Sequence, residues 1–181
     1  GVFDGEADSD TLTFAGSTSP VTIDLLAGSA TGFSGTVASI TNDFSNVDRL
    51  VGSSATGDTL NGLDVDSAWT IDTPNTYSDL TNSVEFASFE TLNGGSQDDT
   101  FNVFTAETVS LFGNNGNDSF NFQDDAAALT GSISGGPGNN SVSFAGLTTV
   151  AANVVLTGNG GDGFAGSAGS LISGGFAEIL T

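Results

Sequence analysis

The chain has 181 residues and a formal net charge of −21, because 22 acidic side chains face a single basic one, Arg49. This charge excludes binding to nucleic acid and to anionic lipid, and the absence of cysteine and histidine excludes disulfides, thiolate metal sites and histidine catalysis. Hydrophobic residues still make up 37% of the chain, which indicates a folded domain rather than an acidic disordered segment.

Short runs in which apolar residues alternate with small polar ones recur along the chain. This period of two predicts strands with one buried face. In chain order the runs carry Leu12 and Phe14; Val21, Ile23 and Leu25; Trp69 and Ile71; Val109 and Leu111; Val142 and Phe144; and Val154 and Leu156. Glycine and asparagine clusters between the runs predict turns. Three consecutive alanines within 124–129 predict a single helical turn.

The strand starts repeat along the chain. An apolar residue two positions after an aspartate or asparagine recurs at positions 12, 60, 101, 120, 142 and 164, and the last three intervals are 19, 22 and 22. A second motif begins at Phe44, Phe86 and Phe176. A period of about 20 to 22 residues is typical of a rung in a stacked repeat. The sequence therefore predicts an all-β fold, a right-handed parallel β-solenoid (β-helix or β-roll). We expect about nine rungs in one domain spanning 1–181. A β-sandwich of ordinary hairpins is the alternative.

The turns carry the candidate chemistry. Residues 94–99, 113–118, 135–140 and 158–162 are rich in glycine, asparagine and aspartate, and each resembles the nonapeptide G-G-x-G-x-D-x-U-x of hemolysin-type calcium-binding repeats. In that family the aspartate carboxylate and turn carbonyls bind calcium between stacked turns. The resemblance implies calcium as the cofactor, with ligands at Asp10, Asp58, Asp99, Asp118, Asn140 and Asp162. The alternative is that these residues only form turns and keep the chain soluble.

A longer pattern is similar to repeats in very large bacterial surface adhesins and fibre proteins. It consists of Trp69 to Ile71 followed by Phe86 to Gly95. The resemblance implies a non-enzymatic structural segment outside the cell, at the bacterial surface, with cell-surface or matrix polysaccharide as a partner. Two alternatives stay open. One is a carbohydrate-active β-helix enzyme that uses only aspartate and glutamate, and the other is a calcium-dependent ligand-binding adhesin module.

Neither end of the sequence carries a recognisable cap, although stacked repeats normally need one. Joining the last residues to the first continues the repeat, so we expect one period of a tandem or head-to-tail array whose partner is a copy of the same chain. The predicted end-to-end interface contains Gly1, Val2, Phe3, Phe176, Ile179, Leu180 and Thr181. No apolar run approaches the length of about 18 residues that a membrane span requires, so no membrane insertion is expected.

Overall fold

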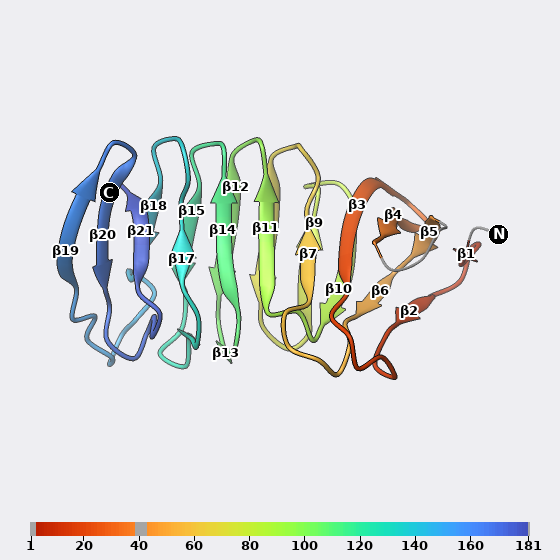
Figure 1. The fold of residues 1–181 in the computed structure, drawn as a ribbon, viewed down its shortest axis with the longest axis horizontal. Helices are drawn as coiled ribbons and strands as arrows, with labels where there is room; N and C mark the ends of the chain where they lie inside the picture. Colours follow the sequence, from red (N-terminus) through yellow and green to blue (C-terminus); the bar gives the residue numbers. More distant parts are fainter. Residues whose placement is uncertain (1–2, 39–42, 181) are drawn as a thin grey trace.

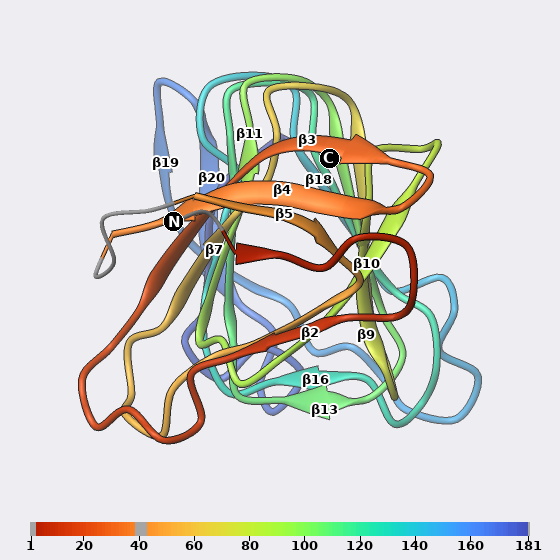
Figure 2. The same ribbon diagram turned by 90° about the vertical axis from the view of Figure 1, so that its right-hand side faces the viewer.

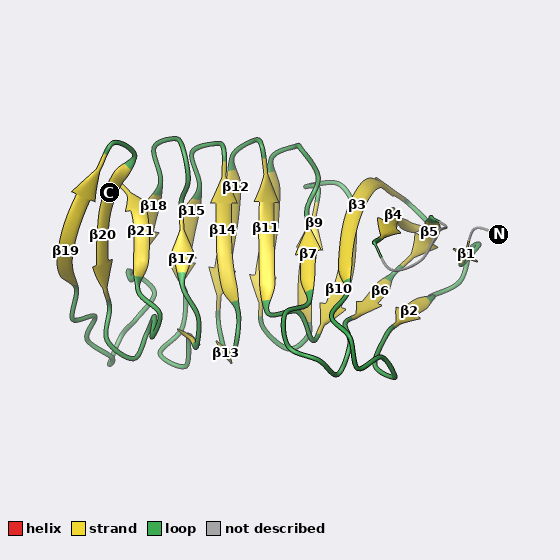
Figure 3. Cartoon of the chain, viewed as in Figure 1, coloured by secondary structure: helices red, strands yellow, loops and turns green. Residues whose placement is uncertain are grey.

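The computed structural model describes residues 3–38 and 43–180. All regular structure in these residues is β-strand (Figure 3), which confirms the all-β prediction. The helical turn expected at 124–129 is wrong, because these residues form a turn that leads into a two-residue strand. The described residues contain no helix long and apolar enough to cross a membrane.

Two long sheets lie along an elongated body and carry most of the strands (Figure 1). The eleven-stranded sheet has, in spatial order, β1 (Phe3–Asp4), β5 (Phe44–Val47), β4 (Gly32–Val37), β3 (Thr22–Ser29), β7 (Thr59–Asn61), β11 (Thr91–Gly95), β14 (Ser110–Asn114), β17 (Ile133–Ser134), β21 (Phe176–Ile179), β20 (Gly163–Ser167) and β19 (Val155–Gly160). The eight-stranded sheet has β18 (Ser141–Ser143), β15 (Ser119–Phe122), β12 (Asp99–Val103), β8 (Ser67–Ile71), β9 (Asn75–Ser78), β10 (Ser83–Ala87), β6 (Arg49–Val51) and β2 (Thr11–Thr13). A small third sheet pairs β13 (Ala106–Glu107) with β16 (Ala128–Leu129).

The central part of both sheets is parallel, and the chain alternates between them. β7, β11, β14 and β17 pair in parallel in the first sheet, and β8, β12, β15 and β18 do so in the second. Equivalent residues therefore stack one strand spacing apart. The inner face of the first sheet carries the row Ile23, Leu60, Leu92, Leu111, Ile133 and Phe176. The inner face of the second carries Trp69, Phe101, Phe120 and Val142.

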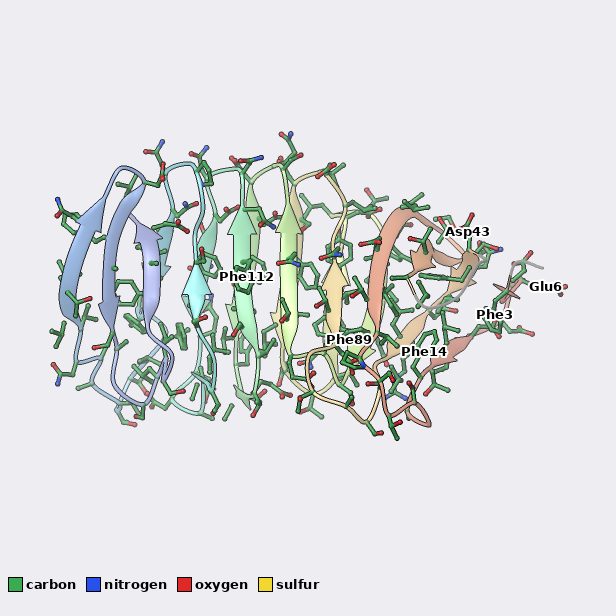
Figure 4. The ribbon with its side chains drawn as sticks, in the orientation of Figure 1. Phe3, Glu6, Phe14, Asp43, Phe89 and Phe112 are labelled. Atoms are coloured by element: carbon green, nitrogen blue, oxygen red, sulfur yellow. The ribbon has the colours of Figure 1, made fainter. Side chains whose placement is uncertain are left out.

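These rows form the hydrophobic core. The rings of Trp69, Phe101 and Phe120 are stacked, with centroids 5.6 Å and then 5.0 Å apart, and all three side chains are fully buried. The predicted inward row of Phe101, Phe120 and Val142 is confirmed. The outward residues of the same strands are mostly threonine, serine and asparagine, with Asp24, Ala68 and Ala177 among them, and Phe112 on β14 is an aromatic exception (Figure 4).

The motif that begins at Phe44, Phe86 and Phe176 has one backbone shape in all its copies. The third residue has a positive φ each time, 54° at Asn46, 62° at Ser88 and 60° at Glu178. The first and fourth residues of each copy are buried. The left-handed residue turns the strand so that both of these residues face the core, which alternation alone forbids.

The two ends of the body differ. At the N-terminal end β3, β4 and β5 run across the end of the body (Figure 2), and β4 contacts β10 of the other sheet. Phe33, Phe44 and Val47 are buried beneath these strands. The N-terminal end is therefore covered, contrary to the expectation that both ends lack a cap. Of the predicted interface residues, Phe3 lies at this end and is 42% exposed.

At the C-terminal end no such cover is present among the described strands. Phe176 and Ile179 are buried on β21, and Leu180 is 40% exposed. Gly1, Val2 and Thr181, which the sequence also placed in the interface, lie outside the described residues.

Candidate functional site

A row of buried polar side chains follows one corner of the body, where the chain passes from the first sheet to the second. Asp99 opens β12, and Asp118 and Asn140 directly precede β15 and β18. Their exposed fractions are 1%, 0% and 0%. Ser67, at the start of β8, stands in register with Asp99 and extends the row by one level. We call these four residues the corner row.

Hydrogen bonds run from level to level along the corner row. The backbone N–H of Asp99 donates to Oδ1 of Asp118 at 2.9 Å, and that of Asp118 donates to Oδ1 of Asn140 at 2.9 Å. The Ser67 hydroxyl donates to Oδ1 of Asp99. At the last level the Asn140 amide donates to the carbonyls of Gly136 at 2.7 Å and Glu178 at 3.2 Å. Each side-chain oxygen thus orders the strand start of its neighbour.

Glycine makes the space for this row. A Cβ placed on Gly94 would lie 2.2 Å from Oδ2 of Asp99, and one on Gly113 would lie 2.1 Å from Oδ2 of Asp118. Gly135 is equally close to Asn140, with Nδ2 at 2.5 Å from such a Cβ. Glycine therefore recurs at this position because the side chain of the corner row packs directly against it. Any larger residue would collide with that side chain.

Burial changes the protonation of the two carboxyls. Loss of hydration raises the pKa of Asp99 to about 7, and the charges of Asp118 and Asp66 act in the same direction. Loss of hydration likewise raises the pKa of Asp118 to about 6, with a further contribution from the charge of Asp98. Oδ2 of each carboxyl is buried without a hydrogen-bond partner. An uncompensated carboxylate oxygen is costly in such a place, so a proton on Oδ2 suits the site.

An exposed row runs beside the corner row, one residue earlier in each turn, and sequence reasoning missed it. The backbone N–H of Asp98 donates to Asp66 at 3.3 Å, that of Asn117 donates to Asp98 at 2.7 Å, and that of Asn139 donates to Asn117 at 2.9 Å. Sequence reasoning also missed Ser67. The signal for both was the doubled polar residue, such as Asp98-Asp99 and Asn139-Asn140, directly before each strand.

The side chains of the corner row do not supply a calcium site on their own. Calcium needs six to eight oxygen ligands at about 2.3–2.6 Å. Each level offers one side chain, and its Oδ1 already accepts a hydrogen bond. The Asn140 amide donates hydrogen bonds to the carbonyls of Gly136 and Glu178. Nowhere in 3–38 and 43–180 do three or more acidic side chains gather into a group that could hold a metal ion.

The other three predicted ligands lie elsewhere. Asp58 precedes β7 in the first sheet, where it accepts the backbone N–H of Val21 at 2.7 Å and that of Ser53 at 2.6 Å. Asp10 precedes β2 at the N-terminal end, and its N–H donates to Asp48. Asp162 is exposed in the turn between β19 and β20. The structure thus brings together only Asp99, Asp118 and Asn140 from the predicted set.

A cavity of about 350 Å³ lies on another side of the body, where β10 and the segment before β11 face β13. Glu90 and Glu107 both line it. Glu90 is engaged structurally, because its carboxylate accepts the backbone N–H groups of Gly57 and Asp58, both at 2.9 Å. The Glu90 carboxylate therefore has a structural role, and Glu107 supplies the second carboxylate of the cavity.

No family model matches this chain, and no curated protein or solved structure matches it either.

Proposed function

We propose that the chain is a non-enzymatic structural segment of a bacterial extracellular fibre or adhesin, folded as a parallel β-solenoid. The observation that carries the proposal is the level-by-level stacking of like residues: an aliphatic row, an aromatic row and the corner row, each one strand spacing apart. Such stacking produces a stiff body whose levels add one by one. Its buried carboxyls are sealed from solvent, which suits structural support and does not suit catalysis on a substrate.

The proposal includes end-to-end association with copies of the chain, either covalent in a tandem array or head to tail. Edge strands at the ends support it. In the described residues β18 pairs only with β15 and β19 only with β20, so each has one edge of unpaired backbone groups. Unpaired edges readily accept a further strand. Cell-surface or matrix polysaccharide is a second proposed partner, from the adhesin resemblance alone.

Calcium enters the proposal only at the exposed side of the turns. Asp66 and Asp98 in the exposed row are hard oxygen donors with solvent access, so water can supply the ligands that the one side chain at each level does not. Binding there would reduce the repulsion among carboxylates that the single arginine cannot neutralise. Arg49 itself lies 3.8 Å from Glu85 in a half-exposed pair at another place.

A carbohydrate-active enzyme is the second candidate, and the cavity with Glu90 and Glu107 is the observation that favours it. Glu107→Gln separates the two candidates. If the chain degrades a neutral polysaccharide and this variant does not, the enzyme reading replaces the structural one. We expect neither chain to release reducing ends.

Hydrogen exchange at the edges tests the structural proposal. We expect amides of β18 and β19 to exchange rapidly in dilute protein and more slowly as the concentration rises, because association pairs their free edges. The central strand β14 is the internal control, since neighbours on both sides already pair it. Exchange at β18 and β19 that does not depend on concentration would contradict end-to-end association.

A further inference from the structure

The two sheets end at different levels at the C-terminal end. β17 and β18 belong to the same level, but the first sheet continues through β21, β20 and β19, whereas the eight-stranded sheet stops at β18. Three strands of the first sheet therefore extend beyond the second (Figure 1), and no described strand lies opposite their inner face. We call these strands the overhang.

The inner face of the overhang is apolar and open. It forms one wall of a groove of about 320 Å³ whose eight lining side chains are all apolar. Leu156 on β19 is 58% exposed and Phe164 on β20 is 41% exposed. Contiguous apolar surface at the end of a core indicates a contact surface rather than a solvated face.

This end is also the least charged part of a very acidic chain. Residues 141–180 contain two of the 22 acidic side chains, Asp162 and Glu178, and no basic one. The covered N-terminal end begins with Asp4, Glu6, Asp8 and Asp10. Two C-terminal ends can therefore approach each other with little repulsion, whereas an N-terminal end would bring its acidic residues to the groove.

The overhang leaves a step at the C-terminal end, where the second sheet stops three strands before the first, and the shape of this step determines how two copies can fit together. Stacking by simple translation, head to tail, would leave a gap three strands wide in the shorter sheet. In the alternative arrangement the second copy is rotated by half a turn about an axis parallel to the strands. This rotation points the two C-terminal ends at each other and places the first sheet of one copy in line with the second sheet of the other. Each overhang then lies opposite the other, with β20 facing β20 of the second copy, and β19 of one copy meets the free edge of β18 of the other. Since strands in the two facing sheets run in opposite directions, these edges would pair antiparallel.

We propose that two copies of this chain join by their C-terminal ends, each overhang filling the step of the other. This isologous contact is self-complementary and closed. It covers both apolar grooves and pairs two pairs of sheet edges. It rests on the proposed end-to-end association, but it replaces the tandem or head-to-tail array with a pair of copies joined C-terminal end to C-terminal end.

The mass of the 181-residue chain in solution, followed by light scattering during size exclusion over a range of concentrations, is the first test. We expect twice the single-chain mass of 18.0 kDa. Leu156→Asp places a charge in the contact and should weaken the dimer about ten- to hundredfold. Leu26→Asp is the matched control, because Leu26 is 59% exposed on β3, away from the groove. It should leave the dimer intact.

Cross-linking tests the symmetry. The chain has no cysteine, so two single-cysteine variants, Ser143→Cys on β18 and Asn159→Cys on β19, report without background. Mixed and treated with a short bismaleimide, they should form a heterodimeric product, since the contact places β18 of one copy beside β19 of the other. In a head-to-tail contact both strands lie on the same side of the junction and no such product forms.

Three results would overturn the inference: a monomer at every concentration, a dimer that Leu156→Asp does not weaken, or association without the mixed cross-link. The last of these, with elongated assemblies, would still support the proposed function through a head-to-tail contact. A monomer would leave the groove to a different occupant, and it would contradict both this inference and end-to-end association of separate copies.

Discussion

Replacing Asp118 by asparagine should remove part of the pH dependence that the corner row gives to this protein's stability. Asn140 occupies the next level of the same row, and its amide donates to carbonyls that a carboxylate cannot bind. The asparagine in Asp118→Asn keeps an oxygen for the N–H of Asp99 and gains a donor where Oδ2 now has no partner. The groups that face the replaced carboxyl are Asp98, Asp99 and Asn140.

The direction follows from linkage. Burial raises the pKa of Asp118 from 3.8 to about 6, so the folded chain binds this proton more tightly than the unfolded chain does. The stabilisation is complete below the unfolded pKa and is lost as the pH rises through 6. A shift of this size corresponds to about 3 kcal/mol. The exposed row lies one residue away, so water close to this corner weakens the effect to about 1–2 kcal/mol. Asp99, whose pKa is raised to about 7, adds to the same trend.

The assay is urea unfolding at pH 4.5 and pH 8, followed by fluorescence of Trp69, the single tryptophan, which is fully buried. We expect the wild-type chain to be more stable at pH 4.5 with respect to this row, and the difference between the two pH values to shrink by about 1–2 kcal/mol in Asp118→Asn. Asp162→Asn, in an exposed turn, is the control and should not change the difference. Equal pH dependence in the wild-type chain and Asp118→Asn would refute the reasoning.

Three further outcomes are expected. Gly113→Ala should lower the free energy of unfolding by about 2–4 kcal/mol, because the new Cβ meets Asp118. Gly16→Ala is the control, since no atom lies within 4 Å of its Cβ, and it should change this free energy by less than about 1 kcal/mol. Urea midpoints measure both variants, and equal effects would contradict the packing role of Gly113. Asp125→Ala should speed hydrogen exchange at Thr148, Thr149 and Val150, whose N–H groups donate to this carboxylate at 2.8–3.1 Å, with little change in the core. The Thr149 hydroxyl, together with these N–H groups and the Thr148 hydroxyl, lowers the pKa of Asp125, so the contact should persist in mild acid and be lost only in strong acid. Calcium should raise the melting temperature by a few degrees relative to chelator through Asp66 and Asp98, and an unchanged melting temperature would remove calcium from the proposal.

Local pattern predicted the strands but not which sheet each belongs to. The alternation in Thr100-Phe101-Asn102 correctly predicted an inward phenylalanine that stacks on Phe120. The same pattern in Thr59-Leu60-Asn61 belongs to the first sheet, in register with Leu92. Both sheets need a hydroxyl or amide outside and an apolar residue inside, so one signature serves both. The sequence motif places Asp58 and Asp99 in one series, but they lie at the starts of strands in different sheets. Strand pairing separates them, whereas the local sequence does not.

The ends were the least predictable part of the fold. The N-terminal end is covered because β3, β4 and β5 cross the body and bury Phe33 and Phe44. This packing joins residues far apart in the sequence, so no local pattern reveals it. The corner row was only half predictable. Its aspartates were found by their turns, whereas their burial follows from Gly94 and Gly113 stacking beneath them.

Electron microscopy of the concentrated chain shows directly whether this stiff β body associates end to end. Eleven strands at about 4.8 Å span roughly 50 Å, and two copies with interlocked overhangs span about nineteen strand spacings, roughly 90 Å. We expect straight particles of at least the greater length and of the same width as one copy. A field of single particles near 50 Å at high concentration, with or without calcium, would contradict end-to-end association.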